Sequence, residues 1–201
     1  PGMVSKASST LGESNSKVAT AVQTLLPALL GRLLKKGDIP QMVEILQDSG
    51  KGNLLKHVEG LFEGHGVING MNLGERMENA LLGTKENDFI ADVASKSGMA
   101  HETTNRLSNW VSGTIAAYFG DKMVHGKRSF ADLLRDLESE KNALRANIPS
   151  NIYSTLGLAA VMSPHNATTQ RNATENAKRA TAESSDRQQT TSTTPKQKNT
   201  T

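Results

Sequence analysis

SKVATAVQTLLPALLGRLLKKG, residues 16–37, is the stretch that decides the fold of this chain. Its apolar residues recur at steps of four, three and one, which is the spacing of a broad stripe on one face of a helix: Val18, Val22, Leu25, Leu26, Leu29, Leu30 and Leu33. Ser14 or Ser16 can cap the start, and the sequence at 35–37 is typical of a helix end. The pattern predicts a long core-facing helix, in which Pro27 removes one backbone hydrogen bond and demands a kink or a break.

The predicted burial of this stripe has an energetic consequence. If the stripe faces the core, Leu26→Ala or Leu30→Ala costs about 2–5 kcal/mol of folding free energy. A near-neutral result means instead that the stripe faces solvent, a membrane surface or a partner.

Further helical segments follow, each with residues typical of a helix start or end. No stretch has the sustained alternation of apolar and polar residues that is typical of a half-buried strand. Glycines make 64–70 read as a flexible loop, Asn72 and Glu75 have the spacing of a helix cap, and so do Ser129 and Asp132. We therefore expect an all-α, multihelical orthogonal array of about seven to nine short helices. The helical segments are 38–50, 53–62, 72–83, 84–98, 101–123, 129–137 and a last piece around 152–156 after Pro149.

The segment 101–123 is the longest of the later helices. Its expected inner face consists of Leu107, Trp110, Val111, Thr114, Ile115 and Tyr118. Aligning Gly31 with Gly120 matches its apolar positions to those of the 16–37 helix. A duplicated helical unit and chance similarity between two amphipathic helices both remain open.

Composition divides the chain into a lead-in or truncated helix at 1–13, a helical domain at 14–163 and a polar tail at 164–201. The tail contains no Leu, Ile, Val, Met or aromatic residue, so we expect it to be disordered. It carries six basic and three acidic residues, which leaves 17 of each in the rest of the chain. The excess of positive charge therefore belongs to the tail, and a neutral core gives no sequence signal of phosphate binding.

Other chemical features of the sequence are weak. There is no cysteine, so disulfides and thiolate metal sites are excluded, and no run approaches the ~20 apolar residues of a membrane span. The start at Pro1 and Gly2 indicates a truncated N-terminus, so the compartment is left undetermined between cytoplasm and cell envelope. Asn166, Asn172 and Asn199 begin glycosylation-like triplets that a Thr- and Asn-rich tail produces by composition.

No catalytic, metal or cofactor site is predicted. The five histidines lack helical ligand spacing and are expected to be surface or core-edge residues: His57, His65, His101, His125 and His165. The sequence at 50–53 resembles a phosphate loop only faintly and is interpreted as the turn that starts a helix. Glu75 and Glu78 share a helix face, and without a cleft we expect that face to be solvated.

Five short blocks in order resemble the bacterial YidB-like family. They are Leu11-Gly12-Glu13; Leu26-Pro27-Ala28-Leu29-Leu30-Gly31; Asn72-Leu73-Gly74 leading to Leu81-Leu82-Gly83; Ala94-Ser95-Lys96-Ser97-Gly98-Met99; and residues 141–149 followed by Leu156-Gly157-Leu158. The resemblance implies a multihelical fold and brings no catalytic residues. In some relatives the domain precedes a peptidoglycan-associated OmpA-like domain, which would make the tail a linker.

The sequence favours a noncatalytic helical interaction or scaffold module of a bacterial protein, with a protein partner or self-association. One alternative is a nucleic-acid-binding protein that uses helix-turn-helix-like units and the basic tail. A second is a small-ligand carrier with a pocket between helices near Trp110 and Tyr118.

Overall fold

The computed structural model describes residues 2–36, 39–52 and 65–162, which fold into helices and connecting turns without a strand. This confirms the all-α prediction. The chain divides into the units Pro1–Ser163 and Pro164–Thr201, and the described residues all belong to the first. Its elements are α1 (Met3–Leu11), α2 (Asn15–Lys36), α3 (Pro40–Lys51), α4 (His65–Leu81), the 3-10 helix η2 (Gly83–Lys85), α5 (Glu86–Ser97), α6 (His101–Val124), α7 (Phe130–Ser139), α8 (Lys141–Asn147), α9 (Ser150–Thr155) and α10 (Ala159–Met162).

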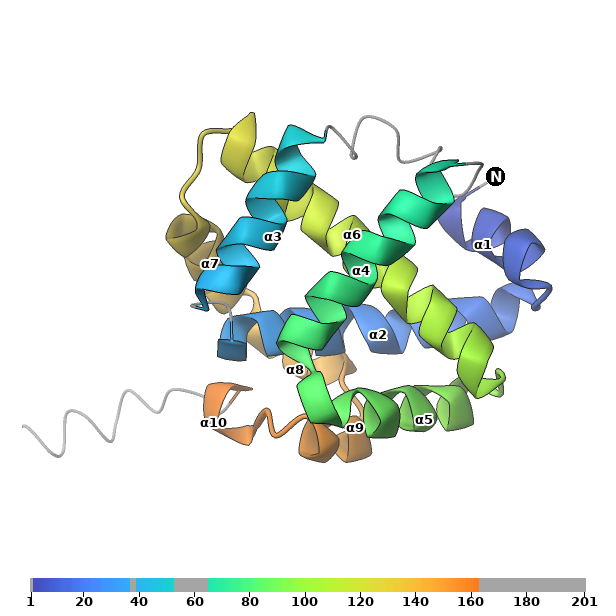
Figure 1. The fold of residues 1–201 in the computed structure, drawn as a ribbon. Coiled ribbons are helices and arrows are strands. Elements are labelled where there is room, and N and C mark those ends of the chain that lie inside the picture. The colour runs from blue at the N-terminus through green and yellow to red at the C-terminus, as the bar shows by residue number, and fades with distance from the viewer. Residues whose placement is uncertain (1, 37–38, 53–64, 163–201) are drawn as a thin grey trace, which may run out of the picture. The chain divides into compact units, whose positions relative to one another are not determined.

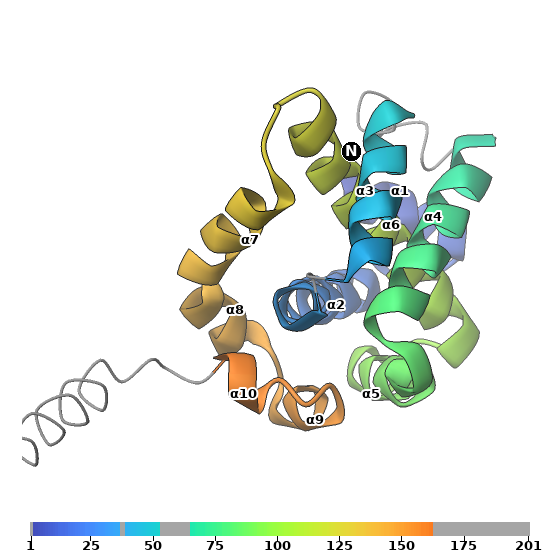
Figure 2. The same cartoon turned by 60° about the vertical axis from the view of Figure 1, so that its left-hand side comes forward.

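Helix α6 is the element on which the others are arranged. Figure 1 shows α3 and α4 lying across it, and these two helices make its most extensive contacts. Helix α2 also contacts α6 and is covered by α5, α8 and α1. In the turned view of Figure 2, α7 to α10 curve around α2. The core is thus built around two long helices, α2 and α6, each covered by several shorter ones.

Glycines set the distance between α6 and the two helices that cross it. A Cβ atom on Gly74 would stand 1.8 Å from the carbonyl oxygen of Asn109, and one on Gly113 would stand 2.4 Å from that of Gly70. Between α3 and α6, a Cβ on Gly50 would stand 2.2 Å from the carbonyl oxygen of Gly120. Backbones this close leave no room for a side chain. Both crossings therefore depend on glycine.

This packing explains why the predicted loop at 64–70 is wrong from residue 65 onward. Helix α4 begins at His65, and Gly70 is buried inside it against α6. Asn72 and Glu75 consequently lie within α4 and do not cap its start. The glycines that read as loop signals serve helix-to-helix contact instead.

Helix α2 begins and ends as the sequence predicts. The backbone amide of Lys17 donates to Ser14 Oγ at 3.3 Å, and the last helical residue is Lys36. The helix continues through Pro27 without a break. Leu25, Ala28 and Leu29 around it are fully buried, and this packing offsets the lost hydrogen bond.

Cationic side chains from earlier helices donate hydrogen bonds to backbone carbonyls in the C-terminal part of the domain. Arg32 is buried and donates from Nη1 to the carbonyl oxygen of Leu156 at 3.1 Å and from Nε to that of Leu81 at 3.0 Å. Lys35 donates to the carbonyl of Gly157, and Lys85 donates to the carbonyl of Thr155 at 2.8 Å. The carbonyls of Thr155, Leu156 and Gly157 lie at the end of α9, and that of Leu81 lies at the end of α4; a helix carries partial negative charge at this end. Burial lowers the pKa of Arg32.

Several other boundaries are confirmed. Helix α5 ends before Gly98, whose φ of 69° is left-handed, and α6 spans 101–124. Ser129 caps α7 by accepting from the amide of Asp132 at 3.1 Å. The predicted segment 53–62 and the predicted tail 164–201 lie outside the described residues.

Gly113→Ala tests the close crossing of α4 and α6. The added methyl group meets the backbone of Gly70, which cannot rotate away, so the free energy of unfolding should fall by at least the ~1–3 kcal/mol typical of an overpacked core. Urea denaturation followed by circular dichroism measures the loss. Asn72→Ala, on the exposed side of α4, is the control and should stay within about 0.5 kcal/mol of the parent chain. Equal stability of the two variants would contradict the glycine argument.

Candidate functional site

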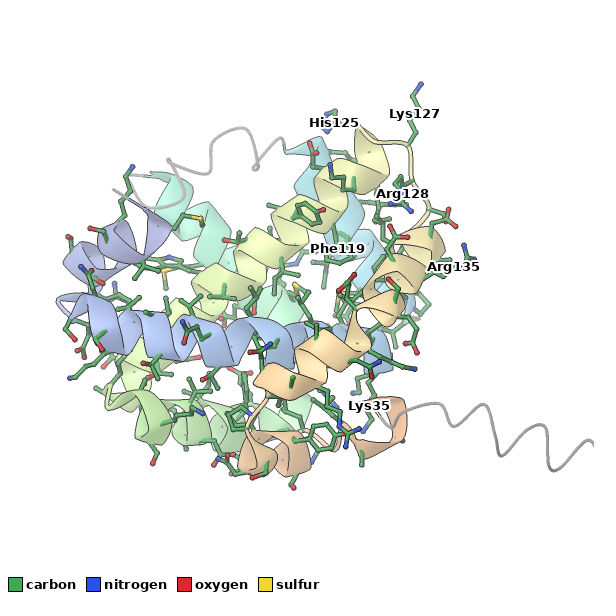
Figure 3. The ribbon with its side chains drawn as sticks, turned by 180° about the vertical axis from the view of Figure 1, so that it is seen from behind. Lys35, Phe119, His125, Lys127, Arg128 and Arg135 are labelled. Atoms are coloured by element: carbon green, nitrogen blue, oxygen red, sulfur yellow. The ribbon has the colours of Figure 1, made fainter. Side chains whose placement is uncertain are left out.

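The most prominent candidate site is an apolar hollow of about 540 Å³ between α1, α2, α6 and α7. We call it the α2–α6 groove. Figure 3 views this side of the molecule, with α2 crossing α6, α1 toward one end and α7 toward the other. Its lining consists of Met3, Val4, Ala7, Val22, Leu26, Leu30, Leu107, Trp110, Val111, Thr114, Ile115, Tyr118, Phe119 and Leu137.

Three large apolar side chains of the groove are exposed. Met3 is 47% exposed, Leu26 41% and Tyr118 48%. The predicted burial of Leu26 and of Tyr118 is therefore wrong. The stripe of α2 is broader than the surface its neighbours cover, so Leu25 and Leu29 enter the core while the row that includes Leu26 borders the groove.

Aromatic side chains form the interior and one part of the rim. Trp110, the only tryptophan of the chain, is 4% exposed. Phe119 packs edge-on against Tyr118, with ring centroids 5.7 Å apart, and against Phe130 at 6.4 Å. The ammonium group of Lys122, one turn beyond Tyr118, lies 5.5 Å from the centre of the tyrosine ring. The groove is thus apolar inside and has a cation beside its exposed tyrosine.

A second hollow, of about 510 Å³, lies between α3, α6 and α7. Its lining is mixed: Val43, Gln47, Lys51, Met123, Val124, Arg128, Ser129 and Phe130. Arg128 is paired with Asp136 at 2.5 Å, and Lys51 lies 3.7 Å from Asp48. These ion pairs use the charges that could otherwise bind a ligand there.

Glu78 is a buried polar residue that the sequence did not reveal. It was expected on a solvated helix face with Glu75, but its exposed fraction is 0% and only Glu75 is exposed. Ser108 and Ser112, one turn apart on α6, both donate to Glu78 Oε1, the second at 2.7 Å. Glu78 Oε2 has no hydrogen-bond partner within the described residues. Burial raises the pKa of Glu78 to about 7, although the two serine hydrogen bonds lower it.

The remaining candidates do not form a site. His101 and His125 are exposed, and His125 Nδ1 lies 3.1 Å from a carboxylate oxygen of Asp121. His57 and His165, and the side chain of His65, are outside the description. Residues 2–36, 39–52 and 65–162 contain no cluster of three potential metal ligands. Gly50 and Lys51 lie in the last turn of α3, and the helix predicted to start after this segment lies outside the described residues.

The sequence matches the family described as "Bacterial protein of unknown function (DUF937)" over residues 1–122. The chain belongs to the DUF937 family. This confirms the resemblance to the YidB-like family, which is the same family. The matched residues include the whole lining of the α2–α6 groove except Leu137. Comparison with curated proteins and with solved structures gave no match.

No helix among the described residues of this DUF937 member has the length and apolar content needed to span a membrane.

Glu78→Gln should change how stability depends on pH. The pKa of Glu78 is about 7 in the folded protein, above the ordinary value of 4.5. Between pH 4.5 and pH 7 the folded protein therefore binds more protons than the unfolded protein, so the free energy of unfolding falls as the pH rises through this range. The loss amounts to about 3 kcal/mol, and an amide at the same position removes it. Urea unfolding between about pH 4.5 and pH 8 measures the slope. Glu75→Gln is the exposed control, and identical slopes for the parent chain and Glu78→Gln would show that Glu78 does not titrate in this window.

Proposed function

We propose that this chain is a noncatalytic helical binding module that holds its partner by an apolar part placed in the α2–α6 groove. The observation that carries the proposal is the exposure of Met3, Leu26 and Tyr118 around one concave apolar surface. Exposed apolar side chains gathered in one concavity are typical of a binding surface, whereas scattered ones are common on any protein.

The way in which the groove is built supports a binding role. Described residues of four helices from separate parts of the sequence contribute to it, and Trp110 and Phe119 are buried in its interior. The buried charged residues of the described part of the domain, Arg32 and Glu78, are engaged in holding helices together. Neither lines the groove, so the proposal assigns the groove to binding and not to bond-making chemistry.

The volume of the α2–α6 groove favours a small ligand as its occupant. Ligand pockets typically measure about 300–1,000 Å³ with mainly apolar walls, and the α2–α6 groove falls within this range. A stable protein interface usually engages about 20–30 residues on each side, which is more than the groove provides. We therefore infer that the occupant is small or presents only a narrow apolar segment.

Nucleic-acid binding is not the function we propose. Figure 3 shows His125, Arg128 and Arg135 near the corner where α6 meets α7. Each contacts an aspartate: His125 contacts Asp121, Arg128 contacts Asp136, and Arg135 contacts Asp132. Pairing of these three basic side chains with aspartates weakens their attraction for phosphate.

Leu26→Asp tests the proposal with N-phenyl-1-naphthylamine, an uncharged apolar dye that becomes fluorescent in apolar sites. The parent chain should bind the dye, and the charged variant should lose binding because a carboxylate enters the groove. Leu26→Ala should leave the free energy of unfolding nearly unchanged, since the side chain is exposed.

Leu25→Ala is the matched control one residue away. Leu25 is fully buried, so its replacement should cost about 2–5 kcal/mol while leaving the groove in place. Dye binding that survives Leu26→Asp would contradict the proposal.

A further inference from the structure

We propose that the ligand of the α2–α6 groove is a free single-chain anionic amphiphile of the fatty-acid class, with its alkyl chain in the groove and its carboxylate beside Lys122. This inference rests on the proposed function and names the ligand class. It joins three observations: an interior whose described lining carries no charge, a cation at the rim, and the distance between the two.

The interior of the groove accepts only an apolar chain. None of the described residues that line it is charged. The hydroxyl of Thr114 is already used, because it donates to the carbonyl oxygen of Trp110 at 2.9 Å. Burying a polar ligand group here would leave that group without a hydrogen bond, at a cost in free energy. An alkyl chain avoids this cost.

The rim offers a cation that no described carboxylate neutralises. Lys122 has its ammonium group over the Tyr118 ring, and no ion pair is formed by it within the described part of the chain. Its neighbour Asp121 is engaged by His125 at 3.1 Å, and Arg128 is engaged by Asp136 at 2.5 Å. An anionic head group at this place gains an attraction that a neutral or cationic one lacks.

The length of α6 between the interior and the rim suits a chain of moderate length. Trp110 and Lys122 are both on α6, 12 residues apart, which corresponds to about 18 Å along the helix axis. A head group at Lys122 therefore places the far end of an extended alkyl chain toward Trp110. The hollow of about 540 Å³ provides the space.

Binding of three twelve-carbon amphiphiles tests the head-group preference. Dodecanoate, dodecanol and dodecyltrimethylammonium, each below its micelle-forming concentration, are titrated against the full chain by displacement of N-phenyl-1-naphthylamine. Dodecanoate should bind most tightly, and Lys122→Glu should weaken it by about two- to fivefold or more, as expected for a partly exposed charge pair. Lys127→Glu is the control, because it makes the same charge change at an exposed position that, unlike Lys122, does not lie over the Tyr118 ring.

Bromine-labelled chains test the orientation. Bromine quenches tryptophan fluorescence at short range, and Trp110 is the only tryptophan. We expect 12-bromododecanoate, labelled at the tail end, to quench Trp110 more strongly than 2-bromododecanoate, labelled beside the carboxylate. The reverse order would overturn the proposed orientation.

The outcomes separate this inference from the function on which it rests. If the three amphiphiles bind with equal affinity and Leu26→Asp abolishes dye binding, the proposed preference for an anionic ligand is wrong. The proposed function as a binding module then still holds. Absence of dye and amphiphile binding overturns both. A dimer in sedimentation velocity that dissociates in Leu26→Asp and in Tyr118→Gln would make a second copy the occupant and overturn the ligand class. Both positions are exposed, so these variants should fold.

Discussion

The close approach of α3 and α4 to the backbone of α6 is the constraint on which the rest of the structure depends. Glycines at both crossings let carbonyl groups of one helix stand where a side chain of the other would be. Ser49 reinforces the α3 crossing by donating to the carbonyl oxygen of Ala116 at 2.7 Å. With one side of α6 occupied in this way, its bulky residues are left to face α2 and α1, where they create the groove.

Local sequence signals predicted the helices well and their contacts poorly. The stripe of 16–37, the left-handed Gly98 and the Ser129 cap depend on neighbouring residues, so each could be recognised from sequence. The helical role of Gly70 could not be recognised from sequence, because it depends on a backbone contact with Gly113, which is far along the chain. A pocket near Trp110 and Tyr118 was foreseen as one alternative, but the exposure of Leu26 depends on which neighbours cover α2.

Two buried polar residues show why the domain interior could not be reconstructed from hydrophobic periodicity alone. Glu78 and Arg32 occupy helix positions that face the core, and each is held by hydrogen bonds from or to distant elements. Glu78 joins α4 to α6 through serine hydroxyls, whereas Arg32 joins α2 to the carbonyl of the last residue of α4 and to the carbonyl that follows α9. Such hydrogen-bond partners are brought together by the fold, and no sequence pattern within either helix predicts them.

The bond between Arg32 and the carbonyl of Leu156 also sets a condition on how the chain folds during synthesis. The two residues are 124 positions apart. At a translation rate of about 5–20 residues per second, Arg32 is made roughly 6–25 s before its acceptor. Nascent chains that end before Leu156 must keep that guanidinium hydrated or hold it by other groups, so the contact of α2 with the end of α9 closes only when nearly the whole domain has left the ribosome.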